Sequence, residues 1–170
     1  RGTNPSDWSI YYYDESGHRV MSARGGVGKV YAGLFNDDGT STESFYPGIG
    51  VKAGGAQYYT VRDPAGSTAL VLDASGNVVQ YAAYEAYGGL RANDAFDPAP
   101  ADGITPYKTD YLFGGKERDR TFAPADDIYD HGPRMYFADV GTWLTADPTY
   151  NDGPNRYTFV HGDPINYADP

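Results

Sequence analysis

Cysteine is missing from the 170-residue sequence, and its absence excludes a disulfide framework and thiol catalysis. Long apolar runs are missing too. No stretch approaches the roughly 18 consecutive apolar residues that a membrane-spanning helix needs, so no membrane span is predicted. Lys and Arg do not cluster, and the formal net charge is −10. Because phosphate binding needs clustered positive charge, this balance excludes nucleic acid as a partner class.

Tyrosine, glycine and proline are abundant instead, with 17 Tyr, 22 Gly and 12 Pro. Tyrosine favours half-buried, pleated surfaces because its ring is apolar and its hydroxyl can find a hydrogen-bond partner. Gly and Pro interrupt the chain too often for long helices. The composition therefore predicts an all-β fold of short strands, in a chain long enough to bury a core.

A four-residue turn pattern recurs through the first half of the chain, with Asp, Asn or Glu at its first position and Gly at its fourth. A short carboxylate or amide at the first position accepts hydrogen bonds from the backbone two residues on. Gly at the fourth position adopts the positive φ that closes a bulged hairpin. Five such turns, separated by runs rich in Tyr, Val and Leu, predict a repeat of short antiparallel strands. They occupy residues 14–17, 36–39, 63–66, 73–76 and 85–88.

The chain divides near residue 108. Residues 93–108 lack periodicity and are predicted to form a loop at the end of a first region, 1–108. The second region, 109–170, has isolated aromatics, Arg and Asp-Pro pairs, which predict short strands and turns. We expect the two regions to form one continuous structure.

These motifs resemble a known family. Tyr13-Asp14 followed by the Gly17 turn is similar to a YD repeat, and residues 62–88 resemble the run that precedes the family's core domain. The second region resembles the RHS-repeat-associated core domain over nearly its whole length, with the motifs in the family's order. These motifs occupy residues 111–119, 132–137, 141–148, 155–160 and 163–170.

The resemblance implies an architecture. In RHS/YD-repeat proteins, a β-solenoid spirals into a hollow shell, and the core region coils inward as an irregular plug. The shell holds a variable C-terminal segment, often a toxin, as in Tc-toxin C components and polymorphic bacterial toxins; teneurins form similar shells. The sequence is thus expected to be a shell segment with its plug, from a secreted or cell-surface bacterial protein. A segment this short is expected to need upstream repeats or further copies, because each solenoid layer buries its faces against neighbours.

The resemblance also implies an activity, which is self-cleavage just after the core by paired aspartates. By motif position these are Asp147 and Asp169, with Arg134 as the cation that positions a carboxylate. Asp139 is a weaker third carboxylate. The alternatives are that the Asp-Pro pairs form turns and that Arg134 forms a structural ion pair.

Departures from the family pattern concern activity more than fold. The family pattern continues past the final Asp-Pro with the cleaved bond, whereas this sequence stops at Pro170, and Thr142 stands where an Arg is usual. No metal or other cofactor is predicted, because His18, His131 and His161 lack the spacing of a zinc site.

Two functions remain open at this stage. The first is a shell and plug whose partners are its own C-terminal cargo and upstream repeats, with self-cleavage as its one reaction. The alternative is a module without catalysis, for adhesion to cell-surface glycans or for self-assembly into a fibre, since tyrosines on strand faces suit sugar stacking and subunit packing.

Overall fold

The computed structural model describes residues 9–24, 27–91, 109–119, 126–149 and 154–167. It contains two antiparallel β-sheets, one of nine strands and one of four. The prediction of an all-β fold built from short antiparallel strands and hairpins is confirmed. The loop expected at 93–108, and with it the division at residue 108, lies outside the described residues.

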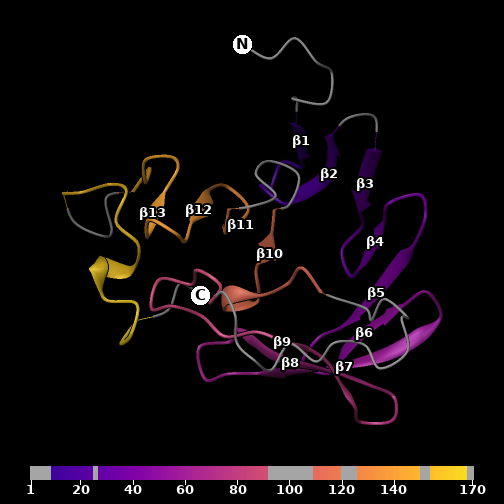
Figure 1. Ribbon diagram of the computed structural model, residues 1–170. Helices are drawn as coiled ribbons and strands as arrows, with labels where there is room; N and C mark the ends of the chain where they lie inside the picture. The colour runs from indigo at the N-terminus through magenta and orange to yellow at the C-terminus, as the bar shows by residue number, and fades with distance from the viewer. Residues whose placement is uncertain (1–8, 25–26, 92–108, 120–125, 150–153, 168–170) are drawn as a thin grey trace.

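The first sheet is a meander in which every strand pairs with the strands before and after it in sequence. Figure 1 shows it as a bent strip that curves from β1–β3 through β4–β6 to β7–β9. The strands are β1 (Ser9–Tyr13), β2 (Arg19–Arg24), β3 (Val27–Tyr31), β4 (Phe35–Asp37), β5 (Thr42–Tyr46), β6 (Gly50–Ala53), β7 (Ala56–Arg62), β8 (Thr68–Asp73) and β9 (Val78–Tyr81).

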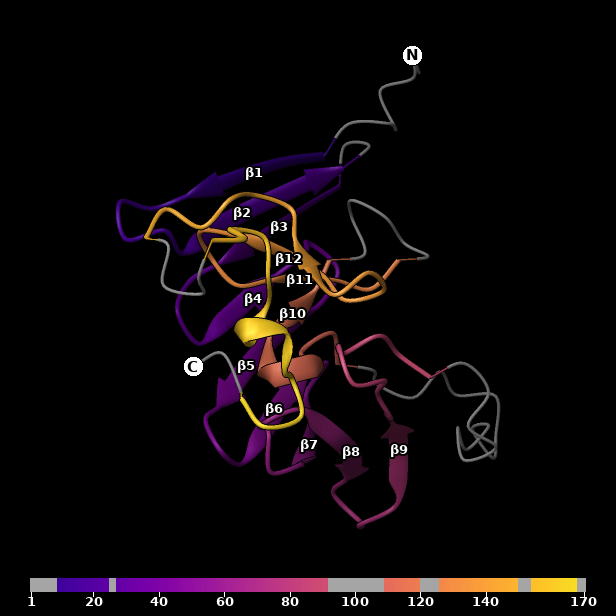
Figure 2. The same cartoon turned by 90° about the vertical axis from the view of Figure 1, so that its left-hand side faces the viewer.

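The second sheet lies on the concave side of this strip, as both views show (Figures 1 and 2). It follows η2, a short 3₁₀ turn at Phe113–Gly115, and a second such turn, η3 (Val160–Gly162), comes after it. Its strands are β10 (Glu117–Arg118), β11 (Ile128–Asp130), β12 (Met135–Phe137) and β13 (Thr142–Trp143).

Three of the predicted turns share one geometry. In the first, the Asp14 carboxylate accepts hydrogen bonds from the backbone N–H groups of Ser16 at 2.9 Å and His18 at 2.8 Å. Gly17 has φ +81°, and the β1–β2 register shifts at Tyr12/Tyr13. The turns that begin at Asp63 and Asp73 repeat this pattern of carboxylate acceptor, positive-φ glycine and register shift.

The turn predicted at 36–39 begins elsewhere. Asn36 lies inside β4, is 2% exposed, and donates its amide N–H to the Tyr111 hydroxyl at 3.1 Å. Asp38 takes the acceptor role instead, with bonds from the backbone N–H groups of Thr40 and Ser41 at 2.9 and 2.7 Å. The prediction was wrong here because the Asn36 side chain lies on the buried side of the strand. Two carboxylates follow it in sequence, and the second, Asp38, accepts the hydrogen bonds of the turn.

Alternation along the strands gives the strip two unlike faces. Register places Tyr11, Ser22 and Lys29 side by side on the face toward the second sheet. Tyr12, Met21 and Val30 align on the opposite face, where Tyr12 is 54% and Val30 50% exposed. The concave face therefore carries the polar contacts to the second sheet.

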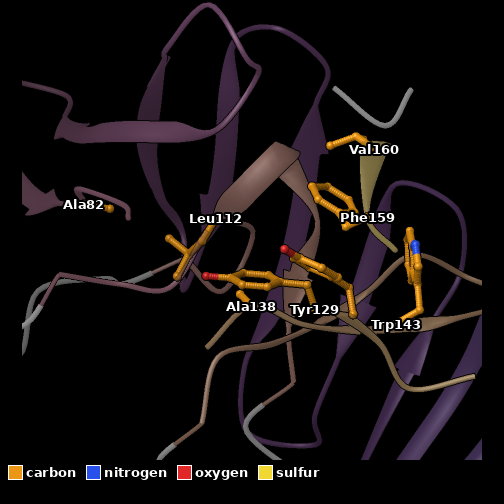
Figure 3. Packing of buried hydrophobic residues seen from close by; sticks show 8 residues of the cluster. Ala82, Leu112, Tyr129, Ala138, Trp143, Phe159 and Val160 are labelled. Atoms are coloured by element: carbon orange, nitrogen blue, oxygen red, sulfur yellow. The ribbon is translucent and has the colours of Figure 1, made fainter. Parts of the chain in front are cut away.

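The hydrophobic core belongs mainly to the second region (Figure 3). Tyr136 and Phe159 stack at 4.1 Å between ring centroids, and Trp143 packs edge-on against both rings. Ala82, from the end of the strip, completes the cluster, so the strip and the second sheet share one core. Its buried members are Ala82, Leu112, Tyr129, Tyr136, Ala138, Trp143, Phe159 and Val160.

Candidate functional site

The structure brings two of the three predicted site residues into contact. Arg134 precedes β12 and Asp147 follows β13, and these two strands form a hairpin. The Leu144 N–H donates to the Met135 carbonyl at 2.9 Å, which extends the hairpin toward its open end. The Arg134 Nη1 consequently lies 3.0 Å from the Asp147 Oδ2.

Asp147 is 6% exposed, and both its carboxylate oxygens are engaged. Oδ1 accepts from the Thr149 N–H at 2.5 Å and from the Thr149 hydroxyl at 2.6 Å, a turn in which Pro148 fixes the backbone. The Asp147 N–H also donates to the Arg156 carbonyl, while the Arg156 Nε donates to the Asp147 carbonyl at 2.7 Å. Hydrogen bonds thus fix both the main chain and the side chain of Asp147.

An aromatic platform supports the arginine. The Arg134 guanidinium carbon lies 3.8 Å from the centre of the Trp143 ring, within the range of a cation–π interaction. Trp143 is itself 2% exposed and packs against His131 at 4.9 Å between ring centroids. The planar guanidinium is therefore held between an indole face and a carboxylate, an arrangement that lysine could not reproduce.

The other predicted carboxylates do not join this pair in the described residues. Asp169 lies outside them, so its approach to Asp147 stays a prediction. The Asp139 Oδ2 accepts from the Asp127 N–H at 2.9 Å. In turn, the Asp127 carboxylate pairs with Arg118 at 2.7 Å and accepts from the Leu90 N–H. Asp139 thus belongs to a separate polar group that links the second sheet to residues 88–90.

Sequence reasoning missed a second charged cluster, buried between the two sheets. Arg19 of β2 contacts Asp119 and Asp130, each at 2.9 Å, and Glu117 at 3.8 Å. Its side chain is 3% exposed, and the guanidinium lies over the Tyr11 ring at 4.5 Å. Burial disfavours the charged guanidinium and lowers the pKa of Arg19. The negative charges of Asp130 and Asp119 raise it by more, so the pKa of Arg19 is raised.

Lys29 of β3 extends this cluster. Its ammonium lies 2.7 Å from Glu117, which also accepts a hydrogen bond from the Tyr31 hydroxyl at 3.1 Å. Burial raises the pKa of Glu117 even though Lys29 and Arg19 oppose the shift. Burial likewise raises the pKa of Asp130 against the effect of Arg19. Two cations of the strip therefore face the acidic groups of β10 and β11, and this joint holds the sheets together.

The described residues contain no group of three or more His, Asp or Glu side chains that could hold a metal ion. None of the helices in this part of the chain has the length and apolar character needed to cross a membrane.

The fold is thus a curved antiparallel strip enclosing a smaller sheet that carries a buried Arg–Asp pair. No family model matches the chain. Toxin subunit YenC1 of Yersinia entomophaga is 33% identical over 113 residues, which is 66% of this chain and 11% of that protein. This similarity relates the chain to a toxin subunit, while the chain spans only about a tenth of that subunit's length.

Solved structures share the fold. The crystal structure of TcdB2-TccC3 matches all of this chain with a TM-score of 0.76 at 22% identity. The Photorhabdus luminescens Tc holotoxin pore, with a point mutation in TccC3, matches with a TM-score of 0.74, also at 22% identity. TcdB2-TccC3 without its hypervariable C-terminal region matches 95% of the chain at 0.71 and 23% identity. In each case the match covers 9% of the larger chain. The fold therefore occurs within Tc toxin complexes.

Proposed function

We propose that this chain is a shell segment and plug of a secreted bacterial RHS protein that encloses a C-terminal cargo. The observation that carries the proposal is the buried joint of Arg19 and Lys29 with the acidic groups of β10 and β11. A joint of this kind holds the second sheet against the concave side of the strip, which is the place of a plug. Similarity to a toxin subunit agrees with this role.

The cargo is inferred from the family resemblance. One matching complex was solved without a hypervariable C-terminal region, so that complex has such a region in its complete form. By analogy, the parent protein would carry a variable segment after residue 170, shielded by the shell until release. The partners are then this segment and the upstream repeats that complete the shell.

We further propose that the plug releases the cargo by cutting its own chain once. Two carboxyl groups that share one proton can act as base and acid on a peptide bond. Asp147 and Asp169 are the proposed pair, with Arg134 positioning Asp147. The contact between Arg134 and Asp147 at 3.0 Å supports the first half of this site.

Intact mass and N-terminal sequencing of the product of the full gene test both parts. Wild type is compared with Asp147→Asn and Asp169→Asn, and Asp163→Asn is the matched control. Asp163 is also followed by proline, and its side chain caps a local turn through Asn166. We expect wild type and the control to yield a fragment that ends shortly after residue 170, while both test variants stay whole.

The opposite results are informative too. Cleavage that persists in both test variants rules out the aspartate pair as the catalytic group. If the wild-type product also keeps its full mass, self-cleavage is wrong, and the plug has a structural role alone. Protease protection of the segment after residue 170 in the Asp147→Asn protein tests the shell separately, because an enclosed segment resists digestion and an exposed one does not.

A self-assembling or adhesive module is the second candidate, and one observation favours it. The face of the strip opposite the second sheet exposes apolar side chains on several strands, such as Tyr12 of β1, Val30 of β3 and Tyr59 of β7. Contiguous exposed apolar surface marks interaction sites. A molecular mass that rises with protein concentration favours assembly through this face, and retention on immobilised glycans favours adhesion. A concentration-independent monomer without retention leaves the shell as the better account.

A further inference from the structure

A pocket lies on the concave face of the strip, at the bend where β5 to β8 meet (Figure 1). The strand register places Phe45, Val51 and Tyr58 side by side on this face. Thr60 and Arg62 follow Tyr58 at intervals of two residues, so the strand period directs them to the same face. The pocket has a volume of about 230 Å³. It is far from the Arg134–Asp147 pair in sequence and has no role in the functions proposed above.

Much of the pocket wall is apolar. Leu34, Phe45, Pro47 and Val51 line it together with Tyr111. The Tyr111 ring packs edge-on against Phe45, with 4.8 Å between the ring centroids. An apolar cavity of roughly 150 Å³ already holds one benzene molecule. The pocket therefore has room for one aromatic ring and a short chain attached to it, and its own aromatic rings favour such a ligand.

Arg62 brings a positive charge to this pocket. Its Nη1 donates to the Gly66 carbonyl at 3.4 Å, which is a long hydrogen bond. Other cations of the described residues, such as Arg19, Lys29 and Arg134, each lie within 4.0 Å of a carboxylate. Within the same part of the chain Arg62 has no carboxylate partner, although acidic residues outnumber basic ones by 23 to 13. A guanidinium has five N–H donors, so Arg62 can bind an anion from outside the chain.

Two threonine hydroxyls also reach the pocket. The Thr68 hydroxyl donates to the Tyr111 carbonyl at 2.7 Å and is thereby engaged. The Thr60 hydroxyl forms no hydrogen bond with the described residues, and it lies on the same strand face as Arg62. A guanidinium and a hydroxyl on one face are the donors that a carboxylate accepts from.

We propose that this pocket binds a small aromatic carboxylic acid in its ionised form. The ring lies against Phe45 and Val51, and the carboxylate accepts hydrogen bonds from Arg62 and Thr60. An amine would be repelled by the guanidinium, and a neutral ligand would gain nothing from it. The inference does not depend on the cargo or on self-cleavage, so each can fail without the other.

The test is a calorimetric titration of the product of the full gene with phenylpropionate at neutral pH. Phenylpropanamide, which has the same shape without the charge, is titrated alongside. Arg62→Gln removes the cation at an exposed position. Lys52→Gln is its matched control, since Lys52 follows Val51 on the neighbouring strand and thus points to the opposite face, where it is exposed.

A second pair of variants tests the location of the site. Thr60→Phe places a ring in the pocket and leaves no room for the ligand. Thr42→Phe is the matched control, because Thr42 is an exposed strand residue that does not line the pocket. If Thr60→Phe does not fold, the two ligands and the Arg62→Gln protein decide the question by themselves.

We expect wild type to bind phenylpropionate about tenfold more tightly than phenylpropanamide, because a hydrogen bond to a charged group contributes roughly 1.5–3 kcal/mol. Arg62→Gln should lose about this tenfold factor for the acid and keep the wild-type affinity for the amide. Lys52→Gln and Thr42→Phe should bind both ligands as wild type does. A folded Thr60→Phe protein should bind neither.

The inference is overturned if wild type does not bind phenylpropionate, or if it binds the acid and the amide equally. An unchanged affinity for the acid in Arg62→Gln overturns the assignment of the cation. An equal loss in Arg62→Gln and Lys52→Gln means that general charge attraction holds the ligand, which also contradicts the site. Undiminished binding by folded Thr60→Phe shows that the ligand binds elsewhere.

Discussion

The guanidinium of Arg19, on the second strand of the strip, lies 2.9 Å from the carboxylate of Asp119, which follows the first strand of the inner sheet. The Asp119 side chain is fully shielded from solvent and that of Arg19 is 3% exposed. An ion pair this deeply buried contributes little net stability compared with apolar residues of the same volume, but loss of one partner is costly. The contact therefore specifies which surfaces meet.

Replacement of Arg19 by leucine is predicted to open the joint between the sheets. It leaves Asp119 and Asp130 buried without their cation, at a cost of about 3–5 kcal/mol. Hydrogen exchange of peptides covering residues 117–119 and 128–137 measures the effect as a loss of protection. Arg91→Leu is the control, because Arg91 pairs with Glu85 in an exposed bridge that contributes less than about 1 kcal/mol. Equal, small effects of both changes would contradict the role of the joint.

Alkaline titration is predicted to separate the tyrosines into two groups. Burial raises the pKa of Tyr31 to about 12 and raises those of Tyr129 and Tyr136 further. A raised folded-state pKa means that these phenols favour the fold below about pH 10 and oppose it as the pH rises further. Tyrosinate absorbance should therefore show a late, cooperative step that coincides with loss of near-ultraviolet circular dichroism. Tyr129→Phe should shrink that step, and a single gradual titration would refute the grouping.

Acid is predicted to loosen the turn after β4. The Thr40 hydroxyl and the backbone N–H groups of Ser41 and Thr40 lower the pKa of Asp38 to about 2. A lowered folded-state pKa supplies stability above the ordinary value of about 3.8, which is lost as the pH falls toward 2. Asp38→Ala should speed amide exchange at 38–41 relative to wild type at pH 5, and the two proteins should converge near pH 2. A difference that persists undiminished at pH 2 would argue against the carboxylate's charge as the cause.

Alanine at Gly88 is predicted to harm the core more than alanine at Gly76. Both glycines have positive φ, +92° and +86°, so each substitution strains the backbone by about 1–2 kcal/mol. A Cβ at Gly88 would also overlap the Phe113 ring, whereas one at Gly76 meets nothing within 4 Å. The overlap adds about 1–3 kcal/mol, measurable as extra loss of exchange protection in β11 and β12. Equal losses in the two variants would mean that the Phe113 ring moves aside freely.

Part of the candidate site could be predicted and part could not. Arg134 and Asp147 were named together because of motif resemblance, and the structure places the Arg134 Nη1 3.0 Å from the Asp147 Oδ2, while their catalytic role stays a prediction. Their spacing in sequence does not by itself indicate that they are close in space. They meet because β12 and β13 pair as a hairpin and both residues lie at its open end. Thr149 could have been found from the Asp-Pro-Thr order, since an Asp side chain commonly accepts from the residue two positions on. No local sequence pattern indicates the ion pairs of Arg19, because the carboxylates that it contacts belong to the second sheet.

The sequence by itself determined the all-β class and three of the turns, because a bond from the Asp14 carboxylate to Ser16 and a positive φ at Gly17 involve only a few neighbouring residues. The Gly54-Gly55 hairpin was not among the predicted turns, although the positive φ values of its two glycines are an equally local feature.

Tertiary structure alone decided which side chains of those strands meet a partner. Asn36 reads as a turn residue, yet it is buried against Tyr111, and Lys29 finds Glu117 on the inner sheet. The physical reason is range: turn chemistry acts over four residues, whereas burial and ion pairing depend on how a bent strip brings distant segments together.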